Sequence, residues 1–505
     1  MNWREKLNFK DLHLEQKKAI DWILNNEVGC IAPECGSGKT VIGLTALLGV
    51  KRIDGSDRVM LVASTSMGIK ETWATEHLKW DHLKHLKVMV LTGDVKDRES
   101  KLLRGFDSCL ESPDVVCISY NSLPWLVEYY EKKKQSPAFW YVFADEGSCL
   151  KGHNSKWREA LGNLSRNARY RVISTATPAP HDAADYWGLC KYLDGAKCLD
   201  APTITRFREL YCRAIPLPNR VGQRYELRKG ASEEIKKRVA HLFYTFNVVK
   251  EVPIEVVNVW ENLSEESLKL YQKLEREQCL NSVITTETGQ LDTEESLDAM
   301  SLANKLAQMA NGFVYADEKL RVSEETLQTM TAQGLRTVLN QKKRIALEVF
   351  DDRARLFLKL VGAIHSKHGH VPIVIAYLFK HDLEVLRSAL PDGVPDTEPN
   401  VVERWNRGEL KYLFLQYARS SKALNLQAGG NILVVYSPTW NWEHDYQIVR
   451  RLARQGQTKD KVWVYRLWLH KTVDEQKYEV LEERGEGHRS FQKIIAEKAR
   501  RSTIS

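Results

Sequence analysis

Two sets of short apolar segments, separated by helical stretches, constrain the fold of this chain most strongly. In the first 230 residues, runs such as VGCIA, VMLVA, DVVCIS and YVFA alternate with helical patterns, and a second set, PIVIAYLF, YLFLQYA, NILVVYS and KVWVYRLW, follows late in the chain. Continuous apolar runs of this length are typical of strands buried on both faces of a parallel sheet. Their alternation with helices predicts an α/β fold with two doubly wound parallel-sheet domains.

Helical patterns dominate between the two sets of strands. Ser264 can cap a helix that carries Leu268, Tyr271 and Leu274 along one side, and Gly312 can end a second helix. These stripes favour core packing over a cofactor site. The sequence therefore predicts a first α/β domain over residues 1–230, a helical insertion over residues 231–350 and a second α/β domain over residues 351–505.

Composition limits the classes of function. Of the 505 residues, 43% are hydrophobic and 28% charged, as in an ordinary globular protein. No apolar run approaches the roughly 18 residues that span a bilayer, and MNWREKLNFKDLHLEQ is too charged for a secretory signal. Nine cysteines without a C-x-x-C pair indicate reduced thiols and no zinc site. The net charge of +8 permits a polyanionic partner without requiring one.

The strongest local pattern is CIAPECGSGKT, a predicted strand and a glycine-rich turn, followed by the helical VIGLTALLG. Gly36 and Gly38 would let backbone N–H groups converge on phosphate oxygens at the positive end of the helix. Lys39 would contact the β and γ phosphates of ATP, and the Thr40 hydroxyl would coordinate Mg²⁺. Together with Ser37, these residues form the predicted phosphate-binding loop, although a proline replaces the first glycine of the longer pattern.

An Asp-Glu pair follows the apolar run in FWYVFADEGSCLKGHNSK. Open α/β sheets bind their ligands at the carboxyl ends of the strands, where Asp145 and Glu146 would lie. Taken alone, the pair is more typical of an acidic loop. Beside a phosphate-binding loop, Asp145 suits the magnesium-binding role and Glu146 suits the role of general base for water. The pair therefore favours ATP hydrolysis over phosphoryl transfer to a small molecule.

Two arginines, Arg451 and Arg454, lie three residues apart in QIVRRLARQGQ. An isolated R-x-x-R is usually part of a solvated basic helix. In a two-lobed ATPase such arginines can instead stabilise the γ-phosphate during its transfer, which is worth roughly 10³ to 10⁵ in rate.

The order of these motifs resembles the superfamily 2 helicases and, within them, the Swi/Snf-type DNA translocases. The resemblance extends over nearly the whole chain through LHLEQKKAIDWIL (glutamine motif), LVASTSMGIKETWATEHLKW (motif Ia), VVCISYNSL, ISTATPAP (motif III), VIAYLFKHDLEVL (motif IV), KALNLQAGGNILVVYSPTWNW (motif V) and QIVRRLARQGQ (motif VI). It implies two RecA-like lobes that use ATP and Mg²⁺, with Gln16 at the adenine. The nucleic-acid contacts it implies are Ser64, Thr65, Ser119, Tyr120 and Asn425.

Some residues depart from the family's pattern. Gly147 and Ser148 replace the usual Ala-His of motif II, Arg450 replaces the Asp of motif VI, and Ser421 and Ala423 stand where motif V usually has glycines. These differences concern the coupling of ATP hydrolysis to movement more than the binding of ATP.

The resemblance implies a compact microbial or phage-type DNA helicase or translocase that acts in repair, recombination or replication. An ATP-switched nucleic-acid clamp with weak hydrolysis is the alternative, supported by the missing histidine and glycines. A P-loop kinase is a third class, but it would not need the second lobe. We expect duplex or branched DNA rather than RNA as the partner, no membrane contact, a monomer, and a place in the cytoplasm of a bacterial or phage-infected cell rather than the nucleus.

Overall fold

The chain divides into two compact units, which are described separately: unit 1 comprises Met1–Lys250 and Arg484–Ser505, and unit 2 comprises Glu251–Glu483. The computed structural model describes residues 8–33, 36–107, 112–137, 139–152, 154–179, 183–216, 223–246, 252–287, 294–315, 346–417, 424–454 and 456–486. Within these residues, no helix has the length and apolar character needed to cross a membrane.

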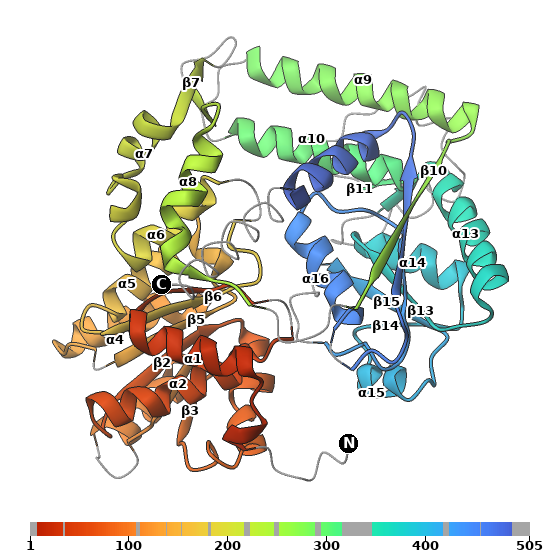
Figure 1. Ribbon diagram of the computed structural model, residues 1–505. Coiled ribbons are helices and arrows are strands. Elements are labelled where there is room, and N and C mark those ends of the chain that lie inside the picture. The colour runs from red at the N-terminus through yellow and green to blue at the C-terminus, as the bar shows by residue number, and fades with distance from the viewer. Residues whose placement is uncertain are drawn as a thin grey trace. The chain divides into compact units, whose positions relative to one another are not determined.

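Unit 1 is built on a seven-stranded sheet in the order β3-β4-β2-β5-β6-β1-β9 (Figure 1). All of its strand pairs are parallel. The strands are β1 (Val28–Ile31), β2 (Val59–Ser64), β3 (Val88–Leu91), β4 (Val115–Ser119), β5 (Phe139–Asp145), β6 (Tyr170–Ser174) and β9 (Phe243–Tyr244). The helices are α1 (Leu14–Asn26), α2 (Lys39–Asp54), α3 (Val95–Leu102), α4 (Leu123–Lys133), α5 (Lys156–Leu164), α6 (Asp185–Leu193), α7 (Ile204–Tyr211) and α8 (Ala231–Val239).

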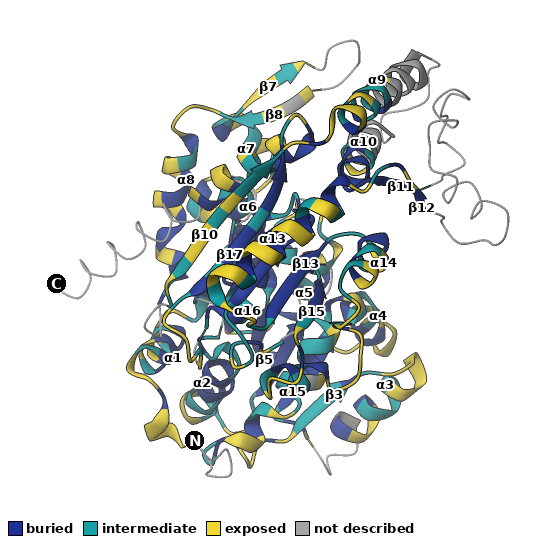
Figure 2. Ribbon diagram, turned by 90° about the vertical axis from the view of Figure 1, so that its right-hand side faces the viewer, coloured by how far each residue is buried: buried dark blue, intermediate teal, exposed yellow. Residues whose placement is uncertain are grey.

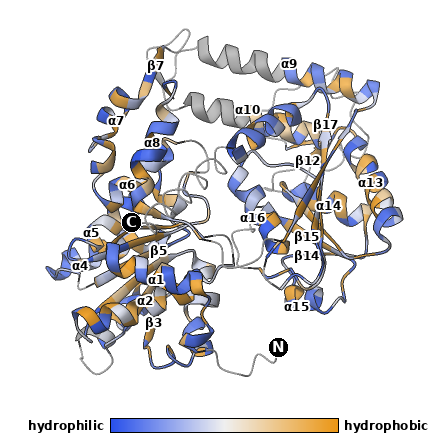
Figure 3. Ribbon diagram, in the orientation of Figure 1, coloured by the Kyte–Doolittle hydropathy of each residue, from blue (hydrophilic) through white to orange (hydrophobic). Residues whose placement is uncertain are grey.

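Helices cover both faces of this sheet. Along β2, Leu61 and Ala63 belong to a buried cluster with residues of α4, α5 and α6. Met60 and Val62 belong to a second cluster, with residues of α1 and α2. Because successive side chains of a strand point to opposite faces, the two clusters lie on opposite sides of the sheet. The strands are mainly hydrophobic, whereas the helices carry both hydrophobic and hydrophilic residues (Figure 3).

Unit 2 contains a six-stranded sheet in the order β10-β17-β16-β13-β15-β14, again with every pair parallel. Figure 2 shows the buried strand β17 beside the edge strand β10, whose residues are intermediate or exposed. The strands are β10 (Ile254–Glu261), β13 (Ile373–Tyr377), β14 (Gly393–Pro395), β15 (Tyr412–Gln416), β16 (Ile432–Val435) and β17 (Val462–Leu469). The helices are α9 (Glu265–Glu287), α10 (Glu294–Ala310), α13 (Asp352–His368), α14 (Lys380–Ala389), α15 (Val401–Asn406) and α16 (Trp442–Leu452).

The predicted α/β fold with two doubly wound parallel sheets is confirmed. The region predicted as a helical insertion over residues 231–350 is divided between the units. β9 pairs with β1 in unit 1, whereas β10 pairs with β17 in unit 2. The sequence signal for these strands is weak, because β9 has only two residues and β10 is a half-exposed edge strand.

The helices α9 and α10 pack on unit 2 as the sequence pattern predicts. Tyr271 and Leu274 of α9 share a buried cluster with Met309 of α10 and with Leu469 and Val473. A short antiparallel pair, β11 (Phe313–Tyr315) with β12 (Ala346–Glu348), adjoins them. The expectation that these helical stripes form core is confirmed.

A fully buried charge cluster links several elements of unit 2. The guanidinium of Arg353 donates to the carbonyl oxygens of Ala310 at 3.2 Å and Tyr436 at 2.8 Å, and it forms an ion pair with Asp474. Lys477 pairs with the same carboxylate at 3.3 Å, and all three charged side chains are inaccessible to solvent. The neighbouring Arg353 and Lys477 charges hold the pKa of Asp474 below its usual value despite its burial. The cluster therefore depends on Asp474 being ionised.

Candidate nucleotide-binding site

The glycine-rich turn joins β1 to the N-terminus of α2, as the motif predicts. Gly36 and Gly38 have φ values of +87° and +77°, in the left-handed region that favours glycine. A Cβ atom on Gly38 would lie 2.5 Å from Nε2 of Gln16. Gly38 is also the N-cap of α2, and as a glycine it has no side chain to cap this helix. The turn therefore presents backbone donors and a helix N-terminus suited to phosphate.

Gln16 lies against this turn. Its Nε2 donates to the carbonyl oxygen of Ser37 at 3.0 Å, and its Oε1 accepts from the backbone N–H of His13 at 2.9 Å. The side chain is buried. The structure thus brings together the residues predicted to bind the nucleotide, Gln16, Gly36, Ser37, Gly38, Lys39 and Thr40, at one end of β1 and α2.

Within unit 1, the predicted phosphate-binding loop and the predicted Asp145 lie at one row of strand ends. Ser174 of β6 pairs with Ile31, the last residue of β1 before the loop, and also with Asp145, the last residue of β5. On the other side of β5, Ser64 of β2 pairs with Ser119 of β4. Because all these strands are parallel, their carboxyl ends share one edge of the sheet, where α/β folds bind ligands.

Asp145 is held in a fixed orientation by its neighbours. Its Oδ2 accepts hydrogen bonds from the Ser64 hydroxyl and from Nε1 of Trp73, both at 2.9 Å. The Tyr120 hydroxyl donates to its backbone carbonyl oxygen at 2.8 Å. Within the described residues, Oδ1 has no hydrogen-bond partner. This arrangement leaves one carboxylate oxygen for an external ligand such as a cation.

The pKa of the Asp145 carboxyl is raised above its usual value. Burial raises the pKa of its carboxyl, since only 9% of the residue is exposed, while the nearby Lys39 charge lowers it. The Glu146 charge raises the pKa further, and the hydrogen bonds from Trp73 and Ser64 lower it. A bound divalent cation would favour the ionised form of this carboxyl.

Glu146 and Lys39 form an ion pair within the site. Glu146 has a φ of +50°, which is uncommon for a residue other than glycine. Thr40 lies in the first turn of α2, beside Lys39. No group of three or more His, Cys, Asp or Glu residues that could hold a metal by themselves occurs in the described ranges. A cation here would thus be held by Thr40, Asp145, the phosphates and water, a donor set that Mg²⁺ accepts.

Two residues predicted to contact nucleic acid lie in the core of unit 1. Ser64 is 1% exposed and Tyr120 is 6% exposed, and both use their hydroxyl groups to hold Asp145. Neither hydroxyl is placed to reach a sugar-phosphate backbone in this structure. Trp73 lies in the motif Ia segment, but its hydrogen bond to Asp145 has no signature in the sequence.

The other predicted contacts in unit 1 have local partners. The Thr65 hydroxyl accepts from the backbone N–H of Gly68 at 3.1 Å, and the hydroxyl groups of Ser119 and Ser122 are 3.0 Å apart. Both Thr65 and Ser119 are partly exposed. These two side chains are therefore accessible at the strand ends, in contrast to Ser64 and Tyr120.

In unit 2, the predicted arginines lie at the end of α16. Arg451 is in its last turn, and Arg454 follows the helix. Nη1 of Arg454 donates to Oδ1 of Asn425 at 2.6 Å, and the carbonyl oxygen of Asn425 accepts from Asn406 at 2.7 Å. A predicted phosphate-binding residue and a predicted nucleic-acid contact are therefore joined directly. The departures at Ser421 and Ala423 lie outside the described residues.

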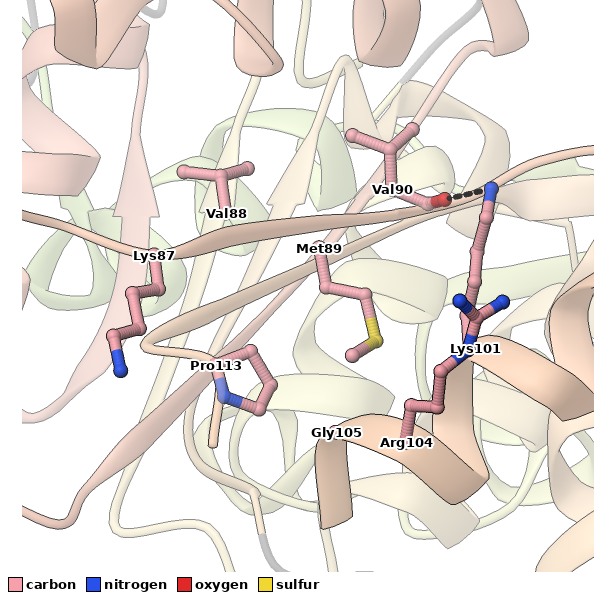
Figure 4. Close-up of a pocket in the computed structure, with 8 residues that line it drawn as sticks. All are labelled: Lys87, Val88, Met89, Val90, Lys101, Arg104, Gly105 and Pro113. Carbon is pink, nitrogen blue, oxygen red and sulfur yellow. Dashed lines mark hydrogen bonds between the residues drawn. The ribbon is translucent and has the colours of Figure 1, made fainter. Parts of the chain in front are cut away.

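A hollow in unit 1 lies apart from this site, along the edge strand β3 (Figure 4). Val88, Met89 and Pro113 form its apolar part. The Lys101 amine donates to the carbonyl oxygen of Val90 at 3.0 Å, at one end of the hollow. Four strands separate β3 from β1 in the sheet order, so the hollow is not part of the nucleotide site.

Comparison with known proteins agrees with this geometry. The SNF2-related domain matches residues 15–313, which is more than half of the chain. A protein described as putative protein p41, from Acyrthosiphon pisum secondary endosymbiont phage 1, is 28% identical over 92% of this chain and 94% of its own length. The mouse DNA repair and recombination protein RAD54B is 24% identical over 89% of this chain, which spans 52% of RAD54B.

Among solved structures, the Sulfolobus solfataricus SWI2/SNF2 ATPase core in complex with dsDNA is similar at 17% identity and a TM-score of 0.41, covering 95% of this chain and 93% of that one. The family assignment rests on the domain match together with the motifs at the strand ends. The chain belongs to the SNF2-related domain family.

Proposed function

We propose that this protein is an ATP-dependent nucleic-acid motor, a DNA helicase or translocase that couples ATP hydrolysis to movement on DNA or to its remodelling. One observation carries the proposal most directly: the phosphate-binding Lys39 is paired with Glu146, next to the buried Asp145, at the shared strand ends of unit 1. Membership of the SNF2-related family supports nucleotide binding and hydrolysis. The RAD54B relative is named for DNA repair and recombination, and this supports DNA as the track.

The residues of unit 1 suggest how hydrolysis proceeds. The backbone N–H groups around Gly36 and Gly38 bind the phosphates, and Lys39 contacts the terminal ones. Thr40 and Asp145 would hold Mg²⁺, and the ion would supply positive charge next to the phosphates. When phosphate replaces Glu146 as the partner of Lys39, the Glu146 carboxylate is released to accept a proton from the attacking water.

The remaining predicted groups come from both units. Arg451 and Arg454 of unit 2 would stabilise the charge on the transferred phosphoryl group, and Gln16 of unit 1 would contact the adenine. Since Arg454 also binds Asn425, loss or gain of its phosphate contact would alter a residue predicted to lie on the nucleic acid. In this proposal, the hydrogen bond between Arg454 and Asn425 would couple the nucleotide to the track.

The candidate track contacts in unit 1 are the accessible Thr65 and Ser119. The buried Ser64 and Tyr120 connect the same strand ends to Asp145 through hydrogen bonds. Movement of the DNA-facing turns would therefore change the position of Asp145, the proposed magnesium ligand. Contacts of this kind engage the sugar-phosphate backbone without reading sequence. The phage relative supports a compact phage-type protein in the cytoplasm of a bacterial cell, and we propose that it acts as a monomer.

One observation favours a second candidate, an ATP-switched clamp with weak hydrolysis. Ser148 occupies the place of the motif II histidine, and Gly147 occupies that of the preceding alanine. A Cβ atom on Gly147 would lie 2.6 Å from Cγ2 of Ile173, so the usual alanine does not fit here without a shift. The backbone of motif II therefore packs more closely against Ile173 than an alanine would allow. In the clamp candidate, this difference weakens the coupling of ATP hydrolysis to movement.

ATP hydrolysis and displacement of a triplex-forming oligonucleotide separate the two candidates. Hydrolysis is measured with no polymer, single-stranded DNA, duplex DNA, a branched junction and RNA. A motor hydrolyses ATP faster with one form of DNA and displaces the third strand from a duplex only with hydrolysable ATP. If ATP and DNA both bind but hydrolysis stays at the DNA-free rate and no strand is displaced, the clamp replaces the motor.

A further inference from the structure

A two-stranded antiparallel hairpin projects from unit 1 and takes no part in the nucleotide site. It consists of β7 (Cys212–Pro216) and β8 (Gln223–Leu227), which form a sheet of their own. Figures 1 and 2 show it beyond α7 and α8, remote from the seven-stranded sheet. Only its base packs on the core of the unit, through Cys212 and Leu227. An isolated two-stranded hairpin is marginally stable in water, so this one depends on the packing of its base.

Positive charge is concentrated on this hairpin, on the helix that precedes it and on the turn that follows it. The described residues 204–216 and 223–230 contain two acidic residues, Glu209 and Glu226, and six basic ones. Their net charge of +4 is half of the +8 carried by all 505 residues. Such local concentration predicts a polyanionic partner. The six basic residues are Arg206, Arg208, Arg213, Arg224, Arg228 and Lys229.

Several of these charges are available to a ligand. Arg228 and Lys229 are exposed, and neither side chain has an ion-pair partner in the described part of the chain. Arg213 pairs across the hairpin with Glu226 at 3.0 Å, where both side chains are accessible. An exposed pair of this kind contributes only about 0–1 kcal/mol, so a phosphate can compete for the guanidinium.

An aromatic residue adds to the character of this surface. Tyr225 is 41% exposed, and the guanidinium of Arg208 lies 4.4 Å from the centre of its ring. The contact holds Arg208 against the hairpin instead of leaving it free in solvent. Exposed aromatic rings beside arginines are typical of surfaces that follow a nucleic-acid strand.

We propose that the β7–β8 hairpin and the turn that follows it bind the sugar-phosphate backbone of DNA, through Arg213 of β7 and through Arg228 and Lys229 of the turn. This contact is additional to those at the strand ends and rests on the proposed function as a DNA motor. Protein interfaces have an apolar core with few charges, whereas this hairpin presents arginines on a narrow ribbon. DNA phosphates therefore fit it better than a folded protein partner does. The contact would make the affinity of the protein for DNA more strongly dependent on salt concentration.

The salt dependence of DNA affinity tests this proposal. We compare the full-length chain with the double variant R228A/K229A, using a fluorescent duplex and a junction at several salt concentrations. The control is K132A/K133A, which removes an adjacent pair of exposed lysines at the end of α4 in the same unit. Each lost phosphate contact lowers the slope of log K against log[salt] by about 0.9, so the hairpin variant should lose up to about 1.8. Matching thermal unfolding midpoints verify that all three proteins are folded.

The outcomes distinguish failure of the hairpin proposal from failure of the proposed function as a DNA motor. A reduced slope for R228A/K229A with an unchanged slope for K132A/K133A supports the proposal. Equal slopes for all three proteins overturn it, and so does an equal reduction in both variants, because that would reflect overall charge alone. If the unmodified protein binds DNA and DNA stimulates its hydrolysis, such a failure concerns only the hairpin. If the unmodified protein does not bind DNA at all, the proposed function fails as well.

Discussion

Replacing Ser64 with alanine removes one of the two hydrogen bonds that hold Oδ2 of Asp145, and it changes little in the volume of the core. A hydrogen bond to a charged group contributes about 1.5–3 kcal/mol. Groups that orient a metal ligand typically contribute 10–100-fold to metal affinity or activity. We therefore expect S64A to raise the Mg²⁺ concentration needed for half-maximal ATP hydrolysis about 10–100-fold.

The same substitution should shift the pH dependence of hydrolysis. The Ser64 hydrogen bond stabilises the ionised carboxylate and opposes the effect of burial, which raises the pKa of Asp145. Loss of this hydrogen bond raises the pKa of Asp145 further. When the solution is acidified, S64A should therefore lose activity at a higher pH than the unmodified protein does. With about 1.36 kcal/mol per pH unit, the loss of about 1.5 kcal/mol moves the acid limb upward by about one unit.

A matched substitution controls for the loss of a buried hydroxyl. Ser165 is also buried in unit 1, and its hydroxyl donates to the carbonyl oxygen of Leu161 at 2.7 Å, away from the nucleotide site. S165A should leave the Mg²⁺ requirement and the pH profile unchanged. The reasoning is refuted if S64A keeps the normal Mg²⁺ requirement but weakens DNA binding, since Ser64 would then be a track contact, as its motif predicts.

Two other substitutions follow from the structure. D474N leaves the buried Arg353 and Lys477 without their anion. Urea denaturation should therefore show that the free energy of unfolding of unit 2 falls by about 3–5 kcal/mol. A loss under about 1 kcal/mol would show that the cluster tolerates rearrangement. G38A should abolish ATP binding in a fluorescent-nucleotide titration while DNA binding persists, because alanine is strained at a φ of +77° and its Cβ would lie 2.5 Å from Gln16. Normal ATP affinity in G38A would contradict the geometry given for the loop.

The sequence was most informative where local chemistry determines the backbone. The turn around Gly36 and Gly38 follows from residue type, because few residues other than glycine fit a left-handed turn between a strand and a helix. The position of Asp145 at a strand end follows from the apolar run that precedes it. Hydroxyl groups at strand ends were ambiguous. Ser64 and Thr65 are adjacent in the sequence, but one points into the core and the other is accessible.

Long-range contacts were harder to predict. The hydrogen bond from Trp73 to Asp145 joins residues 72 positions apart, and nothing in its neighbourhood signals it. The division of residues 231–350 between the units depends on pairing partners that lie far along the chain, in β1 and β17. Local patterns predicted the helices of this region but could not assign its two edge strands.

Single-turnover hydrolysis of ATP by E146Q, with and without duplex DNA, tests the central claim most directly. Glutamine keeps the size of the side chain but cannot act as a base, and it removes the ion pair with Lys39. We predict that E146Q binds ATP at least as tightly as the unmodified protein and that its DNA-stimulated hydrolysis falls by about 10²–10⁴-fold. Hydrolysis by E146Q at the unmodified rate would contradict the account, because the attacking water would then be activated by another group.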